Sequence, residues 1–243
     1  LELGGKSPVA IFKDANIENA LNGVTASIFG ASGQSCIAGS RLYLENEIYD
    51  EFLEKISLKA SQIKIGEPMN DNTQMGPLCT LAQLKNIEEK VKLTIDQGGK
   101  LIFGGERPKE MNQGWYYKPT IIACEHHDLP TAENELFGPV LSVMKFSGED
   151  EVIKLMNDNP YGLAAGVFSE NNGTALRVSK SVRAGIVFVN TYRLISPVAP
   201  IGGFKNSGFG RESGMETIRD YSRIKTTWIN TSKKILGDPF IIR

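Results

Sequence analysis

The sequence has only three cysteines, Cys36, Cys79 and Cys124. A low, odd count argues against a disulfide framework and favours a reducing compartment, so we expect a cytoplasmic protein with at least one free thiol. The sequence also lacks a signal peptide and any apolar run near the roughly 20 residues that span a bilayer. It begins at Leu1 without a methionine, which we interpret as processing, truncation or excision from a longer chain.

A large charge of either sign is also missing. The 27 Lys and Arg residues balance 28 Asp and Glu residues, for a formal net charge of −1. This balance predicts no electrostatic attraction to nucleic acid or to an anionic membrane. The 243 residues, 41% hydrophobic and 23% charged, are typical of a globular protein with a substantial core.

Apolar periodicity predicts helices that alternate with short strands. One helix begins at Asp14 or Asn16, either of which can cap it. Such alternation predicts an α/β fold with a mostly parallel sheet flanked by helices. The expected helices cover residues 17–28, 49–63, 84–95, 149–157, 172–182 and 215–221, and the expected strands cover 42–44, 101–103, 120–123, 140–145, 164–168, 186–190 and 225–229.

Cys36 is the candidate nucleophile. Small residues, Ser35 and Ala38 among them, surround it and leave room for a substrate carbon. A thiolate is a strong nucleophile, and a nearby cation or helix N-terminus would lower its pKa. A lone cysteine is more often buried and inert, and we assign that role to Cys79 and Cys124.

Two other patterns do not predict a site. The run from Cys124 to Asp128 holds the only two histidines, His126 and His127, and has no partner cluster, so we expect no metal. The segment 197–214 is rich in glycine, which indicates tight turns. Its Gly208 to Gly214 portion does not match the spacing of a dinucleotide-binding fingerprint.

Five motifs, in order, resemble those of the aldehyde dehydrogenase superfamily, and Glu2 and Cys36 are separated by the family's 34 positions. The resemblance covers nearly the whole chain. The motifs are Glu2-Leu3-Gly4-Gly5-Lys6-Ser7-Pro8, Gly33-Gln34-Ser35-Cys36 with Gly39-Ser40-Arg41, Glu135-Leu136-Phe137-Gly138-Pro139-Val140, Asn159-Pro160-Tyr161-Gly162-Leu163, and the run from Gly202 to Glu212.

The resemblance implies oxidation of an aldehyde to a carboxylic acid with NAD or NADP. Cys36 would add to the carbonyl carbon and become a thioester after hydride transfer. Glu2 would act as the general base for hydrolysis, and we expect burial to raise its pKa.

The other implied site residues bind the cofactor or shape the substrate pocket. Leu3, Gly4, Glu135 and Phe137 would contact the cofactor, with Glu135 on the nicotinamide ribose. Glu212 either orders the hydrolytic water or is an ordinary glutamate. Ile201 stands where many relatives have Phe, so a differently shaped substrate pocket is expected. Lys205 and Arg211 are interpreted as solvated charges, since such residues are mostly exposed.

Family members are about twice as long, and this chain resembles their catalytic half. Residues 1–221 would form the catalytic domain and residues 222–243 an oligomerisation tail that pairs with another subunit, giving a homodimer or a dimer of dimers. The dinucleotide-binding half is absent, so impaired or absent redox activity, a weakened dimer and exposed apolar surface at the missing domain's contact are expected. The alternative is a non-catalytic fragment that only folds and associates.

Overall fold

A seven-stranded sheet forms the centre of the computed structural model, which describes residues 1–111 and 113–241. Its strand order is β3-β4-β5-β2-β1-β7-β8, and only the β3–β4 pair is antiparallel. The expected α/β fold with a mostly parallel sheet is confirmed. The strands are β1 (Pro8–Ile11), β2 (Arg41–Glu45), β3 (Lys100–Phe103), β4 (Thr120–Ala123), β5 (Val140–Phe146), β7 (Ala164–Phe168) and β8 (Ile186–Val189), and β6 (Tyr161–Gly162) pairs separately with β9 (Phe204–Lys205).

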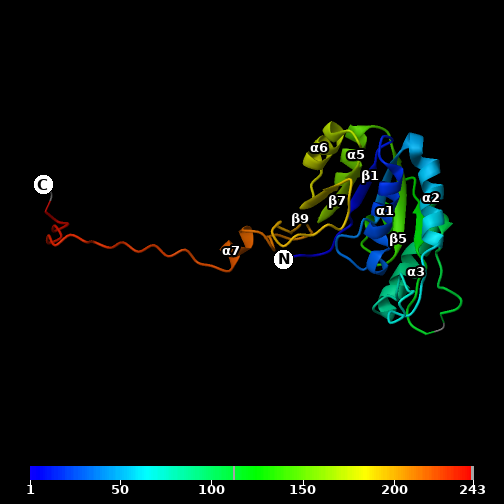
Figure 1. Ribbon diagram of the computed structural model, residues 1–243, viewed down its shortest axis with the longest axis horizontal. Coiled ribbons are helices and arrows are strands. Elements are labelled where there is room, and N and C mark those ends of the chain that lie inside the picture. Colours follow the sequence, from blue (N-terminus) through cyan, green and yellow to red (C-terminus); the bar gives the residue numbers. More distant parts are fainter. Residues whose placement is uncertain (112, 242–243) are drawn as a thin grey trace.

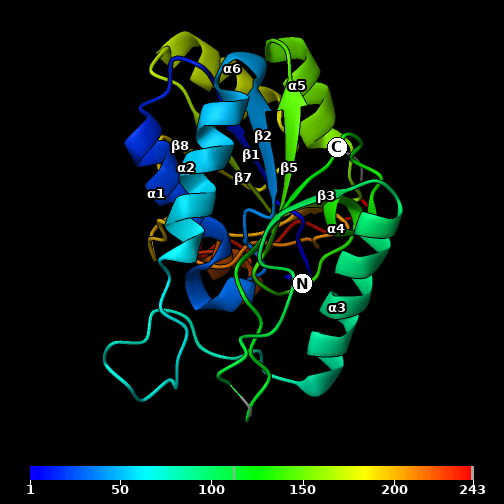
Figure 2. The same ribbon diagram turned by 90° about the vertical axis from the view of Figure 1, so that its right-hand side faces the viewer.

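Helices cover both faces of the sheet (Figure 1). In β1, Val9 and Ile11 join a core cluster with α1 and α2, whereas Ala10 joins a second cluster with α3, α5 and α6. Side chains alternate between faces along a strand, so a strand covered on both sides is apolar throughout. Figure 2 shows α1 and α2 together on one side. The helices are α1 (Ile17–Ile28), α2 (Tyr49–Ser61), α3 (Leu81–Asp96), α4 (Pro130–Glu133), α5 (Glu149–Asn157), α6 (Asn172–Ser181) and α7 (Glu216–Asp220), with short 3-10 turns η1 (Gly30–Gly33) and η2 (Asn46–Ile48).

The two candidate caps of α1 have different roles. The side chain of Asn16 accepts a hydrogen bond from the Asn19 N–H at 3.0 Å and caps the helix. The Asp14 carboxylate instead accepts hydrogen bonds from the Ser169 hydroxyl and the Asn171 N–H. Asp14 therefore fastens the start of α1 to the loop before α6.

One strand was missed, and one predicted strand is absent. Strand β1 was not anticipated, although it lies between β2 and β7 inside the sheet. The strand expected at residues 225–229 is absent, because no described segment lies beside it to supply a hydrogen-bonding partner. Residues 222–241 instead extend away from the body as an exposed chain without helix or strand (Figure 1), and residues 242 and 243 of the predicted tail lie outside the described residues.

No helix in the described part of the chain is long and apolar enough to cross a membrane.

Candidate active site

Three of the motifs lie directly before three neighbouring strands. The segment from Glu2 leads into β1, the segment from Cys36 leads into β2, and the segment from Glu135 leads into β5. These strands are adjacent and parallel, with Pro8 opposite Arg41 and Arg41 opposite Ser142. Segments that precede parallel strands meet at the same edge of a sheet. The fold therefore gathers the three motifs at the amino edge of the sheet.

Cys36 lies in an exposed turn between η1 and β2. The turn is closed by the Ala38 N–H, which donates to the Ser35 carbonyl at 3.0 Å. Partial desolvation and the negative charges of Glu2 and Glu135 raise the pKa of the Cys36 thiol, while the backbone N–H groups of Ile37 and Cys36 lower it. Neither a cation nor a helix N-terminus of the described chain is among the groups that shift the pKa of this thiol.

Glu2 is close enough to Cys36 for its charge to act on the thiol, but it is exposed. The prediction that Glu2 is buried is wrong. Its segment is an edge ribbon, in which Glu2 forms an isolated bridge with Gly208 and the Leu3 N–H donates to the Ser207 carbonyl at 3.0 Å.

Gly4 and Gly5 allow the backbone to approach both other motifs. The Gly5 N–H donates to Oε1 of Glu135 at 3.1 Å, and a side chain at Gly4 would collide with the same carboxylate. A side chain at Gly5 would collide with the carbonyl oxygen of Cys36. The glycines are therefore required by close contact between segments.

Glu135 is partly buried, and its two nearest interactions oppose the effect of burial. Desolvation raises the pKa of its carboxyl group, whereas the hydrogen bond from Gly5 and the positive charge of Lys6 lower it. Phe137, two residues further on, has a φ of 54° and is 41% exposed. Its carbonyl accepts a hydrogen bond from the Gln83 side chain, which holds this left-handed turn beside α3.

Ile201 and Glu212 are brought together at the base of the glycine-rich segment. Each donates its N–H to the other's carbonyl at 2.7 Å. The side chain of Glu212 is exposed and lines a surface pocket together with Glu2 and Phe209. Glu212, which the resemblance assigned to hydrolysis, is therefore paired through its backbone with Ile201, which it assigned to the substrate pocket. Glu212 also lines the same surface pocket as Glu2.

Lys205 and Arg211 are partly exposed, and the prediction of solvated charges omits the backbone carbonyls that both of them bind. The Lys205 ammonium donates to the carbonyls of Asn157 and Asn159 at 2.7 and 3.0 Å. The Arg211 guanidinium donates to the Gly203 and Gly210 carbonyls. Both cations hold the glycine-rich segment in place through backbone oxygens, which a sequence alone does not reveal.

Two buried cations beneath the site were missed. Arg41 is 1% exposed and donates to the Lys6 carbonyl, the Tyr43 hydroxyl and the carbonyls of Leu155 and Met156 at the end of α5. Lys6 is 2% exposed, and its ammonium finds no hydrogen-bond acceptor within the described residues. Burial and, secondarily, the charge of Arg41 lower the pKa of Lys6 to about 7. Lys6 lies within the first motif, and this position is the only sequence signal for it.

Of the remaining thiols, Cys124 is buried as expected, whereas Cys79 is exposed, so the prediction of a buried Cys79 is wrong. The Cys79 N–H donates to the side chain of Gln34, which ties its loop to the Cys36 segment. In the cluster considered for a metal, His127 lies 2.7 Å from a carboxylate oxygen of Asp158. Residues 1–111 and 113–241 contain no group of three metal-ligating side chains.

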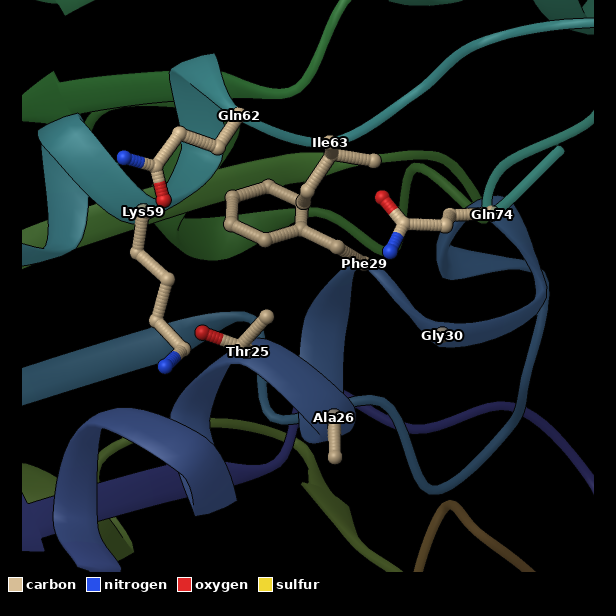
Figure 3. A pocket seen from close by; sticks show the side chains of 8 residues that line it. All are labelled: Thr25, Ala26, Phe29, Gly30, Lys59, Gln62, Ile63 and Gln74. Carbon is tan, nitrogen blue, oxygen red and sulfur yellow. The ribbon is translucent and has the colours of Figure 1, made fainter. Parts of the chain in front are cut away.

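A separate groove of about 360 Å³ lies where the C-terminal ends of α1 and α2 approach each other. Figure 3 shows Phe29 and Ile63 in its middle, with polar side chains around them. Its floor includes the small residues Ala26 and Gly30, and Gly30 begins the η1 turn that leads to Cys36. None of the assigned site residues lines this groove.

Comparisons with known proteins identify the family to which the chain is similar. Residues 1–227 match the aldehyde dehydrogenase family. The chain is 48% identical to (Z)-2-((N-methylformamido)methylene)-5-hydroxybutyrolactone dehydrogenase of Acinetobacter baylyi, over 100% of the chain and 50% of that protein. It is 41% identical to betaine aldehyde dehydrogenase of Bacillus subtilis, over 95% of the chain and 48% of that protein. It also matches the NAD+ complex of the Bacillus cereus aldehyde dehydrogenase with a TM-score of 0.92 and 37% identity, over 96% of the chain and 47% of that one. The chain thus spans about half the length of these relatives.

Proposed function

Because this chain belongs to the aldehyde dehydrogenase family, we propose that it supplies the catalytic half of an enzyme that oxidises an aldehyde to a carboxylic acid with NAD or NADP. The observation that carries the proposal is the meeting of Cys36, Glu2 and Glu135 at the amino edge of strands β1, β2 and β5. This chemistry needs a thiol, here Cys36, and a carboxylate that can reach water, here the exposed Glu2. The half-buried carboxylate of Glu135 is available to the cofactor.

In the proposed reaction, the Cys36 thiolate attacks the carbonyl carbon and forms a C–S bond, and the carbonyl oxygen becomes an alkoxide. The alkoxide re-forms the carbonyl as the hydrogen leaves carbon with its electron pair, which gives a thioester on Cys36. Glu2 takes a proton from water as that water attacks the thioester carbon. Cleavage of the C–S bond releases the acid and restores the thiolate. Glu212, on the side of Glu2, is proposed to help position this water.

The residues present fit the nicotinamide end of the cofactor. Glu135 offers a carboxylate with one oxygen engaged by Gly5, and Phe137 presents an exposed ring two residues away. We therefore propose that Glu135 accepts hydrogen bonds from the hydroxyls of the nicotinamide ribose and that Phe137 packs against the nicotinamide end of the cofactor. Leu3 and Gly4 are proposed to contact the same end of the cofactor. NAD or NADP, when bound, would supply the acceptor for the hydride.

The exposed tail is proposed to mediate subunit association. Ile224 and Trp228, which are 100% and 94% exposed, lie on a segment that has no partner within the described chain. Burial of such side chains against a second subunit would contribute roughly 1.5–3 kcal/mol each. Three free cysteines are consistent with the proposed cytoplasmic location.

The test is alkylation of the folded chain with limiting iodoacetamide, followed by mapping of the adducts by mass spectrometry. We expect Cys36 to react ahead of Cys79, although both are exposed. We also expect the chain to hydrolyse an activated ester slowly. The Cys36→Ala replacement should abolish this hydrolysis, whereas Cys79→Ala should leave it intact. Preferential modification of Cys79, with no esterase activity, would favour the alternative of a non-catalytic fragment. Robust NADH production by this chain alone would show that the expected impairment is wrong.

A further inference from the structure

The loop after β8 places an arginine beside the nucleophile turn. Asn190 starts this loop and is fixed by reciprocal hydrogen bonds with Ser169. Two residues later, the buried Tyr192 donates its hydroxyl to the carbonyl of Ile37 at 2.9 Å. Ile37 directly follows Cys36. Tyr192 therefore ties the loop to the turn that carries the thiol, and Arg193 is the next residue.

The contacts of Arg193 place its guanidinium at the C-terminal end of α1 and the start of η1, the segment that leads to the Cys36 turn. Nη1 donates to the carbonyl of Ala26 at 3.3 Å, and a side chain at Gly30 would lie 2.6 Å from Nη1. Gly30 thus leaves the space that the guanidinium occupies. Arg193 has a φ of 60°, and a side chain held in the left-handed region is retained where its surroundings determine it.

The guanidinium has no fixed counter-charge. Arg193 is only partly buried and forms no ion pair with any carboxylate in residues 1–111 and 113–241. Its one hydrogen bond to protein is long, so most of its donors are available to a ligand. Arg193 directly follows Tyr192, whose hydroxyl binds the Ile37 carbonyl, so the guanidinium belongs to the loop that contacts the nucleophile turn.

An arginine with free donors, on a loop that contacts the nucleophile turn, selects a particular ligand chemistry. The planar guanidinium binds a carboxylate through two parallel hydrogen bonds, which a cationic or apolar group cannot form. The surrounding loop is apolar, since Leu194 and Ile195 are 72% and 60% exposed. It provides surface for a short hydrocarbon between the aldehyde and the carboxylate.

We propose that Arg193 is a specificity-determining residue that favours aldehydes carrying a carboxylate and disfavours aldehydes carrying a quaternary ammonium group. This rests on the proposed function of Cys36 as the nucleophile. In this assignment Arg193 binds the far end of the substrate and takes no part in bond making.

The first test compares two methanethiosulfonate reagents of opposite charge, the 2-sulfonatoethyl and the 2-(trimethylammonium)ethyl compounds, on the whole chain. The rate of the sulfonate reagent divided by the rate of the ammonium reagent at Cys36 does not depend on the thiolate fraction, because both reagents react with the same thiolate. The same ratio at Cys79 corrects for the difference in intrinsic reactivity between the two reagents. Replacement Arg193→Gln is expected to change each rate by roughly twofold in opposite directions, so that the ratio falls roughly fourfold. Replacement Arg193→Lys keeps the charge and should keep the ratio.

The second test measures protection of Cys36 from iodoacetamide by 4-oxobutanoate, by its methyl ester and by 4-trimethylammoniobutanal. We expect 4-oxobutanoate to protect at the lowest concentration, and both Arg193→Gln and Arg193→Lys to remove that advantage, because lysine lacks the bidentate fork. If Cys36 reacts but neither the ratio nor the order of protection depends on Arg193, this inference is overturned and the proposed function stands. If Cys36 is not the reactive thiol, the proposed function itself fails.

Discussion

Replacing Lys6 by methionine is expected to stabilise the folded chain at neutral and acidic pH. The lysine ammonium is 2% exposed and has no hydrogen-bond acceptor within the described residues. Charging it in this position costs free energy that the unfolded chain does not incur. Methionine has a similar length and volume and carries no charge, so it fills the same space without that cost.

The size of this gain in the free energy of unfolding follows from the pKa of Lys6, which is about 7 in the folded chain and 10.5 in its unperturbed state. Between these values the unfolded chain binds the proton and the folded chain does not, so stability rises with pH across this window. Below pH 7 both states are protonated and the full penalty applies. The difference in pKa corresponds to about 5 kcal/mol, from about 1.4 kcal/mol for each tenfold change in affinity for the proton.

Urea denaturation at several pH values between 6 and 10.5 measures this difference. The advantage of Lys6→Met over the parent chain should be largest below pH 7 and shrink steadily toward pH 10.5. A matched control is Lys205→Met, which removes an ammonium that does have two carbonyl partners and should destabilise the chain. A constant difference between the Lys6→Met variant and the parent chain at all pH values, or a less stable variant, would refute the reasoning.

Four further predictions concern the site and the tail. Gly5→Ala should lower the free energy of unfolding by about 1–3 kcal/mol in urea, because the new methyl group collides with the Cys36 carbonyl. Arg41→Ala should cost at least about 3 kcal/mol by the same assay, since it removes four hydrogen bonds and leaves the carbonyls of Lys6 and Met156 without this buried donor. The rate of Cys36 alkylation should keep rising above pH 9.0, because its pKa is raised above that value, and a plateau near pH 7 would contradict this. Deleting the residues after Tyr221 should leave the urea midpoint unchanged and reduce self-association in sedimentation.

Sequence periodicity predicted most of the fold because each helix buries one stripe of its surface. Residues 17–28 and 149–157 were expected as helices and are α1 and α5. Strand β1 was missed because a four-residue apolar run after a glycine-rich motif has no period to recognise. The tail segment 225–229 has strand-forming residues, but propensity supplies no partner for the hydrogen bonds.

The meeting of the candidate site residues could be predicted more readily than their environment. The motifs marked Cys36, Glu2 and Glu135, and the strand order brings all three to one edge. Exposure could not be inferred in the same way. Glu2 is exposed, and the partly buried ammonium of Lys205 is bound by carbonyls far along the chain. Both depend on contacts between distant segments.

The ribbon that carries Glu2 also sets the order in which the site can be completed during synthesis. Glu2 is among the first described residues to be made, yet its segment is held by the backbone of Ser207 and Phe209 and by the Ser207 hydroxyl, which reaches Gly4 across 203 positions. Cys36 and Glu135 can meet through β2 and β5 well before then. A nascent chain therefore carries a nucleophile and its second carboxylate before its general base is fixed. Proteolytic removal of the glycine-rich segment would return a finished molecule to that state.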